Sequence, residues 1–496
     1  MADKLPHHSF TRAQMSIGIS LSKLTYGAEG YLLYTPVINT LVQNGFSGDQ
    51  ILKPGQINTA IDAARSLQLG DGPVASERDW GDDKGYSDFT TLAFQLFGFQ
   101  IEALFSLYFA MLGVAVTLFV LRFYDDRLAL FVLVTFLAAH LLVVQILPNT
   151  GVTSVVHDSR FLPAVSSISM LHWLLAIVRS NKRGVVKFSL LIAQTSILVF
   201  VLNCRSSSIW QIWAIALAFI VGGLWSFRRG DRKRIYSFVL WFGMLVAGVA
   251  GLNIYKDLTY DDRYRSENGT QAHVVWHNVY MGLGFHPEAI KKYDLLPDDS
   301  TVYSHALKYL EQNPEAVKRL GFEGTKLYEP VFVPMGWGGY DKAVKDMFFV
   351  FARNDTTYVA EAFFLYKPML LLEEFAWQVG IKKQFPDWVK MNPVHGPAGD
   401  LRIKFYSLPL LFAMFVAFLA CRGSLAVREA VPTYLVVGLG ATFSLIPSMA
   451  VGPFYYELPV VFIIFSMMLI LVSMTSIDFG LRWKLLRRSA LQKSLD

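Results

Sequence analysis

Long apolar segments recur along most of this 496-residue chain, and short polar or charged stretches separate them. A helix of about 20 apolar residues is long enough to cross the roughly 30 Å hydrocarbon core of a bilayer. The pattern therefore predicts an all-α polytopic membrane protein. Its nine strong spans are expected at residues 101–121, 128–147, 161–178, 188–202, 209–225, 238–252, 408–420, 433–450 and 458–474.

An earlier stretch, residues 13–42, is the candidate for a tenth span, although Lys23 and Glu29 interrupt it. Charged side chains inside a span are costly and rare, so a re-entrant or interfacial segment is the alternative. A tenth span would keep the N-terminus inside. It would also explain how the residues before 101 reach the outer side without a signal-peptide pattern at the N-terminus.

Composition and charge support the membrane assignment. Hydrophobic residues make up 53% of the chain and charged residues 17%, whereas about 25% of a typical soluble domain is charged. The net charge of +6 does not indicate a nucleic-acid partner, because the basic residues cluster beside the spans. These clusters occur at every second crossing, which places all of them in the cytoplasm.

This topology divides the chain into five parts. The first two are residues 1–100, with the N-terminal span and a first outer loop, and residues 101–252, a transmembrane bundle. Residues 253–406 form an outer domain, in which capping residues predict helices over 301–310 and 314–320. Within it, residues 348–377 mix aromatic and charged residues as interfacial segments do. The last two parts are the C-terminal transmembrane helices at 407–476 and a basic cytoplasmic tail at 477–496.

Four carboxylates cluster at the end of the first outer loop, before an apolar helix that enters the membrane near residue 91. They belong to Asp79, Asp82, Asp83 and Asp88. Such carboxylates can supply a general base or bind a cation, and a solvated acidic turn that caps the helix is the alternative. A divalent cation is the only cofactor that the sequence suggests, and no residue is predicted as a metal ligand.

The layout of the chain resembles the GT-C superfamily of glycosyltransferases, which use polyprenyl-phosphate-linked sugars. The similar features are a weak first span, an acidic first outer loop, many further spans and a large outer domain. The resemblance implies that Asp82, Asp83 or Asp88 is the base that deprotonates the acceptor. It further implies a glycan, lipid or protein acceptor, and a bacterial inner membrane with the site facing the periplasm.

Arginines in the predicted outer segments are candidates for binding the leaving phosphate. Sugar transfer goes through an oxocarbenium-like transition state, and arginine pairs with a phosphate through two parallel hydrogen bonds. Two of these arginines also break the cytoplasmic charge pattern, although a snorkelling or salt-bridged side chain is the alternative. The candidates are Arg160, Arg205, Arg263 and Arg265.

A second motif surrounds His277, which precedes Asn278 and Tyr280. It resembles the His-Asn-x-Tyr motif in the outer loop of O-antigen ligases and polymerases, and implies His277 as the catalytic residue. Arg205 resembles the arginine of their Ser-Arg pattern, although Cys204 stands in place of the serine. The alternative is an aromatic interfacial helix whose histidines satisfy local hydrogen bonds.

A transporter or a non-catalytic scaffold is the competing class. A transporter would need ionisable groups within its spans and a repeated half. The predicted spans offer His140, His172, Gln145, Gln194 and Gln211 as polar candidates, but no buried acid. The sequence therefore favours an enzyme that transfers a hexosyl or pentosyl group from a polyprenyl-phosphate carrier at the outer face.

Overall fold

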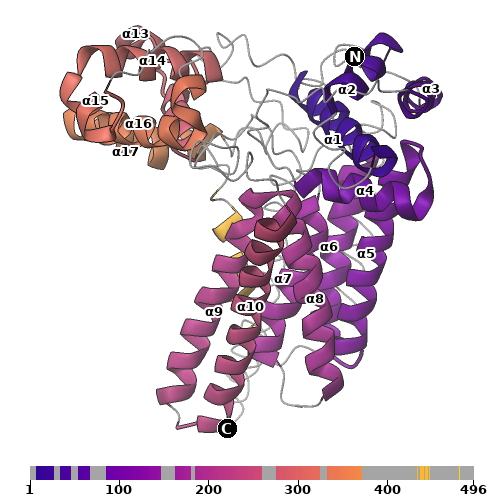
Figure 1. The fold of residues 1–496 in the computed structure, drawn as a ribbon. Coiled ribbons are helices and arrows are strands. Elements are labelled where there is room, and N and C mark those ends of the chain that lie inside the picture. Colours follow the sequence, from indigo (N-terminus) through magenta and orange to yellow (C-terminus); the bar gives the residue numbers. More distant parts are fainter. Residues whose placement is uncertain are drawn as a thin grey trace.

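The computed structural model is almost wholly helical over the residues that it describes, and no strand occurs among them (Figure 1). The all-α prediction is therefore confirmed for this part of the chain. The described residues are 7–26, 34–45, 54–67, 85–146, 162–179, 185–228, 230–259, 275–323 and 332–370, with a few positions between 433 and 480.

Five of the described helices are long and apolar enough to cross a membrane. They coincide with five of the predicted spans, so the chain is a membrane protein. The helix α6 (Arg127–Ile146) occupies a sixth predicted span, and the predicted spans 408–420 and 458–474 lie outside the described residues. The five helices are α5 (Glu102–Phe123), α7 (Leu162–Arg179), α8 (Val185–Cys204), α9 (Ile209–Arg228) and α10 (Arg232–Thr259).

The most buried of these helices is α7, with 16 of its 18 residues shielded by α5, α6, α8 and α9. Two amides link it to its neighbours. Gln194 accepts a hydrogen bond from the Ser169 hydroxyl at 2.6 Å and donates to the Ala115 carbonyl at 2.8 Å, while Gln211 donates to the Pro163 carbonyl at 2.9 Å. Hydrogen bonds of this kind hold helices together where the hydrophobic effect cannot. They give both glutamines a structural role in the bundle.

The stretch 13–42 is not one continuous helix. It contains parts of α1 (His7–Tyr26) and α2 (Tyr34–Gln43), which pack against each other so closely that a Cβ added to Gly18 would lie 2.4 Å from Ile38 Cγ1. Neither helix is among the five that could cross a membrane. Over the described residues, two packed helices therefore stand where a single span was predicted.

The predicted entry into the membrane is divided between two helices. α4 (Gly85–Phe97) ends at a turn in which Gly98 has a φ of +90°, a conformation that glycine adopts without steric cost, and α5 follows. α3 (Pro54–Arg65) secures this turn, because Asn58 accepts the Ile101 N–H at 2.8 Å and donates to Glu102 at 2.9 Å. Figure 1 shows α1 to α4 gathered at one end of the bundle.

The described helices after residue 274, called the outer domain after the side of the membrane predicted for them, share a hydrophobic core of their own. The two helices predicted within it are confirmed: the Asp298 carboxylate accepts the Thr301 N–H at 2.7 Å at the start of α14, and Pro314 begins α15. The described part of 348–377 is helical to residue 370. The elements are α12 (Val275–Met281), the 3-10 turn η6 (Gly282–Phe285), α13 (Ala289–Tyr293), α14 (Asp299–Gln312), α15 (Pro314–Leu320), α16 (Phe332–Asn354), α17 (Thr356–Glu361) and the π-helical turn η7 (Ala362–Tyr366).

The contact between α4 and α8 can be tested at Gly85, where an added Cβ would lie 2.0 Å from the backbone oxygen of Asn203. We expect Gly85→Ala to destabilise the protein by about 1–3 kcal/mol, the usual cost of overpacking. Thermal unfolding of the purified protein in detergent measures the effect. Gly113→Ala in α5 is the matched control, because a Cβ there meets nothing within 4 Å. Equal midpoints for the two variants would contradict the close contact.

Candidate functional site

Asp88 joins three elements that are far apart in the sequence. It lies in the first turn of α4, and its side chain is only 12% exposed. Its Oδ2 accepts a hydrogen bond from the Asn203 amide of α8 at 2.8 Å, and its Oδ1 lies 3.6 Å from the Lys23 ammonium of α1. A carboxylate removed from water needs such partners to stay charged.

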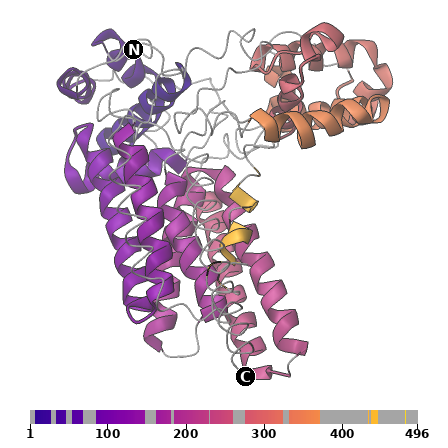
Figure 2. The ribbon, with the colours of Figure 1, turned by 180° about the vertical axis from the view of Figure 1, so that it is seen from behind.

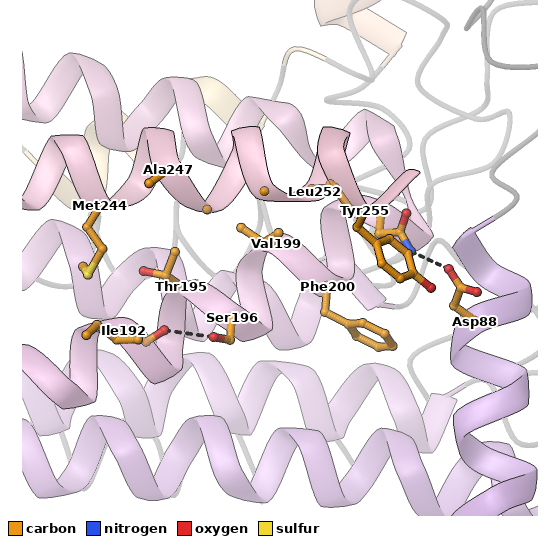
Figure 3. Close-up of a pocket in the computed structure, with 13 residues that line it drawn as sticks. Asp88, Ile192, Thr195, Ser196, Val199, Phe200, Met244, Ala247, Leu252 and Tyr255 are labelled. Carbon is orange, nitrogen blue, oxygen red and sulfur yellow. Dashed lines mark hydrogen bonds between the residues drawn. The ribbon is translucent and has the colours of Figure 1, made fainter. Parts of the chain in front are cut away.

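A fourth element reaches this carboxylate because α10 is longer than predicted. The span was expected to end at residue 252, but α10 continues to Thr259. The added turns bring Tyr255 beside Asp88, as Figure 3 shows. The phenol and the carboxylate interact there.

A cavity of about 600 Å³ lies between α8 and α10 and has Asp88 at one end (Figure 3). This volume is within the usual range of small-molecule sites, about 300–1,000 Å³. Two hydroxyls that line it, those of Thr195 and Ser196, donate to backbone carbonyls of α8 at 2.8 and 3.2 Å. The cavity walls are otherwise mostly apolar, formed by Ile192, Val199, Phe200, Met244, Ala247, Gly248, Gly251 and Leu252.

Arg205 lies at the same end of the bundle but does not line this cavity. It is half-buried and has an extended backbone (φ −146°), by which the chain leaves α8 and enters the 3-10 turn η5 (Ser206–Ser208). Arg205 thus follows two residues after Asn203, the residue that binds Asp88. The other five predicted site residues lie outside the described residues: Asp82, Asp83, Arg160, Arg263 and Arg265.

His277 belongs to a second site, in the core of the outer domain. Its side chain is 4% exposed, and both ring nitrogens have partners. Nδ1 lies 2.6 Å from the Tyr340 hydroxyl and Nε2 lies 2.9 Å from Asp299 Oδ1. This agrees with the structural alternative of a histidine that satisfies local hydrogen bonds. It also forms an Asp–His–Tyr chain of the kind that orients an imidazole for proton transfer.

α16 fixes the position of His277 through two adjacent residues. The Asp341 carboxylate accepts the N–H groups of Trp276 and His277 at 2.8 and 3.2 Å, and so caps the start of α12. Burial raises the pKa of the Asp341 carboxyl, although the N–H groups oppose that rise. Burial also raises the pKa of Tyr340 well above its usual range, so the phenol keeps its proton and can donate to His277.

A polar cavity of about 550 Å³ lies next to His277. Tyr303 connects the two, because it lines the cavity and its ring centroid is 5.1 Å from that of His277. His305 also lines the cavity and lies 3.0 Å from the Tyr280 hydroxyl through its Nδ1. Burial lowers the pKa of His305, which favours a neutral imidazole there.

The sequence analysis missed three residues around Asp88. Lys23 was noticed only as a charge that interrupts a span, yet a charge in that setting is itself a sign of function. Asn203 lies in the segment that was chosen for Arg205, but no feature of the sequence indicated that Asn203 contacts Asp88. Tyr255 carried no signal, because it lay beyond the expected end of its span.

The described residues do not favour a cation at Asp88. Its described neighbours there are the Lys23 ammonium, the Asn203 amide nitrogen and the Tyr255 phenol, and none of these is a carboxylate or carbonyl oxygen of the kind that binds a hard cation. Within the part of the chain that the structure describes, no group of three or more histidines, cysteines and carboxylates is arranged to hold a metal. The described residues around Asp88 therefore add no further ligands for the divalent cation that the sequence suggested.

No protein-family model, curated protein or solved structure matches this chain. Similarity to known proteins therefore identifies no family for it. Its function has to be inferred from the residues that meet at Asp88 and at His277.

The His277 contacts can be tested by Tyr340→Phe. We expect this change to destabilise the outer domain by about 1–3 kcal/mol, because Nδ1 of His277 would remain buried without its partner. Limited proteolysis and thermal unfolding of the full chain measure the loss. Tyr236→Phe, at an exposed tyrosine of α10, is the control and should have no effect. Unchanged stability in both variants would show that the Tyr340–His277 hydrogen bond contributes little.

Proposed function

We propose that this protein is a GT-C-like membrane glycosyltransferase. It would move a hexosyl or pentosyl group from a polyprenyl-phosphate carrier to a glycan, lipid or protein acceptor at the outer face of the membrane. The observation that carries the proposal is the apolar cavity between α8 and α10 with Asp88 at its end. Apolar walls suit an isoprenoid chain, because its transfer out of water is favourable. The polar end suits the phosphate and the sugar.

The charges at this end support the proposal. Lys23 lies 3.6 Å from Asp88 and could attract the phosphate of the carrier to this end of the cavity. Arg205 could supply a second cation, since it follows closely on Asn203. Arg160, Arg263 and Arg265 remain candidates for the same role.

In the proposed reaction Asp88 acts as the general base. It accepts the proton of the acceptor hydroxyl, whose oxygen forms a bond to the anomeric carbon of the sugar. The bond from that carbon to the phosphate oxygen breaks, and polyprenyl phosphate leaves with the electron pair. Asn203 fixes the carboxylate through Oδ2. Asp82 and Asp83 remain alternative bases in the same loop.

The orientation of the chain supports an outer site. The basic clusters predict the cytoplasmic side by the positive-inside rule, and Asp88 belongs to the opposite end of the bundle, with α1 to α4 (Figure 1). A bacterial inner membrane with the site facing the periplasm is part of the proposal, by resemblance to GT-C enzymes.

A second candidate function places the chemistry at His277, as in O-antigen ligases and polymerases. The observation that favours it is the Asp299–His277–Tyr340 chain beside a polar cavity of about 550 Å³. A transporter is less well supported, because Gln194 and Gln211 are engaged in contacts between helices.

Asp88→Asn tests the base assignment. We expect the release of polyprenyl phosphate from a panel of lipid-linked sugars, measured in nanodiscs, to fall by about 10²–10⁴-fold, the usual contribution of a general base. Asp62→Asn, at an exposed carboxylate of α3, is the matched control. Full activity of Asp88→Asn would refute the assignment, and loss only in His277→Ala would favour the second candidate.

Gly251→Leu tests the cavity. Gly251 lines it and an added Cβ there meets nothing within 4 Å, so a leucine side chain would begin in open space and reduce the room in the cavity. We expect the KM for a long-chain polyprenyl donor to rise by about 10-fold or more, as for a change of a few methylenes in an apolar pocket. Gly243→Leu is the control on the same helix, because Gly243 does not line the cavity and an added Cβ there also meets nothing within 4 Å. Equal KM values would exclude the carrier from this cavity.

A further inference from the structure

A cluster of aromatic rings connects α12, α16 and η7 in the outer domain. Trp276 has ring centroids 5.5 Å from Phe348 and 5.2 Å from Phe349, and Phe348 lies 6.4 Å from Phe363. Phe364 follows Phe363 directly. We call these five residues the aromatic ridge: Trp276, Phe348, Phe349, Phe363 and Phe364.

The outer members of the aromatic ridge are exposed to an unusual degree. Phe364 is 82% exposed and Phe349 is 45% exposed, and the neighbouring Val275 and Leu365 are also more than half exposed. One exposed apolar side chain is ordinary, but a contiguous group is costly in water and indicates a contact surface. The inner members pack on the core of the outer domain, so this core holds the ridge in place.

Lysines accompany the aromatic ridge. Lys345 is exposed, with its ammonium 5.6 Å from the centre of the Trp276 ring, and Lys342 is exposed one turn earlier on α16. The nearby acids have partners: Asp341 caps α12, Asp346 pairs with Arg319 and Tyr309, and Glu361 lies 3.1 Å from His286 Nε2. On α16 the exposed charges beside Trp276 are therefore the two lysines, Lys342 and Lys345.

Aromatic rings with flanking lysines are typical of surfaces that lie at the boundary between lipid headgroups and acyl chains. Lysines near such a surface gain from anionic headgroups, by about 1 kcal/mol each. The placement agrees: α16 and α17 form the edge of the outer domain nearest the level at which the spanning helices end (Figures 1 and 2). Residues 348–377 were also predicted from the sequence to be interfacial.

We propose that the aromatic ridge is a membrane-docking surface, which inserts into the outer leaflet of the bilayer that the chain spans. Phe349, Phe364 and their apolar neighbours enter the acyl boundary, and Lys342 and Lys345 bind anionic headgroups. The outer domain then lies on the membrane instead of projecting from it. This inference is independent of the proposed enzymatic activity.

An environment-sensitive fluorophore tests the docking. The chain would carry NBD on Phe364→Cys in a Cys421→Ser background, since Cys204 is buried and protected from labelling. In nanodiscs of phosphatidylcholine and phosphatidylglycerol we expect blue-shifted emission that shallow spin-labelled lipids quench. NBD on Glu311→Cys, an exposed position of α14, is the matched control and should emit as in water.

Water-like emission from position 364 would overturn the membrane-docking proposal. A blue shift without quenching would also overturn it, because protein and not lipid would then cover the ridge. A second variant, Lys342→Glu with Lys345→Glu, should reduce the quenching at position 364 in the anionic nanodiscs but not in pure phosphatidylcholine. Equal quenching of this variant and its parent in both would overturn the role of the two lysines.

Discussion

The pairing of one carboxylate, Asp88, constrains the architecture at the end of the bundle where α1 to α4 gather. Asp88 is largely removed from water, and a charge in that position is stable only with polar partners close by. Asn203 and Lys23 are those partners, and they belong to α8 and α1. α4 can approach α8 closely enough for this only because Gly85 has no side chain at the contact. The position of the N-terminal helices is therefore coupled to the charge of a single residue.

The bundle is tightly packed around α7 and has a cavity between α8 and α10. Around α7 the side chains are buried and amides connect the helices, since apolar contact alone gives little preference for another helix over lipid. α10 is much less buried, and two of its glycines, Gly248 and Gly251, line the cavity between it and α8. The same set of helices thus has a rigid centre and, at its edge, room for an apolar chain that reaches Asp88.

The outer domain is stabilised separately, by its own core and by carboxylate caps at the starts of α12, α14 and α17. Its core holds His277 on one side and the aromatic ridge on another. The two candidate bases consequently lie in different cores, and the two candidate functions differ in which core carries the chemistry. With either function, docking of the ridge in the bilayer would hold the outer domain near the end of the bundle that carries Asp88.

The amino-acid sequence by itself determined the features that depend on neighbouring residues. The positions of five spans followed from local hydropathy, because a bilayer demands about 20 apolar residues in a row. The starts of α14 and α15 followed from Asp298 and Pro314, because a helix cap acts within one turn. Asp88 and His277 were selected as candidates by residue type and by resemblance.

Only the tertiary structure decided which residues surround those candidates. Asn203 is 115 residues from Asp88 in the sequence, and nothing in either segment specifies the other. The division of 13–42 into two packed helices likewise depends on contacts between elements. Lys23 and Tyr255 became site residues for that reason, since packing between distant segments, and not local pattern, brought them to one carboxylate.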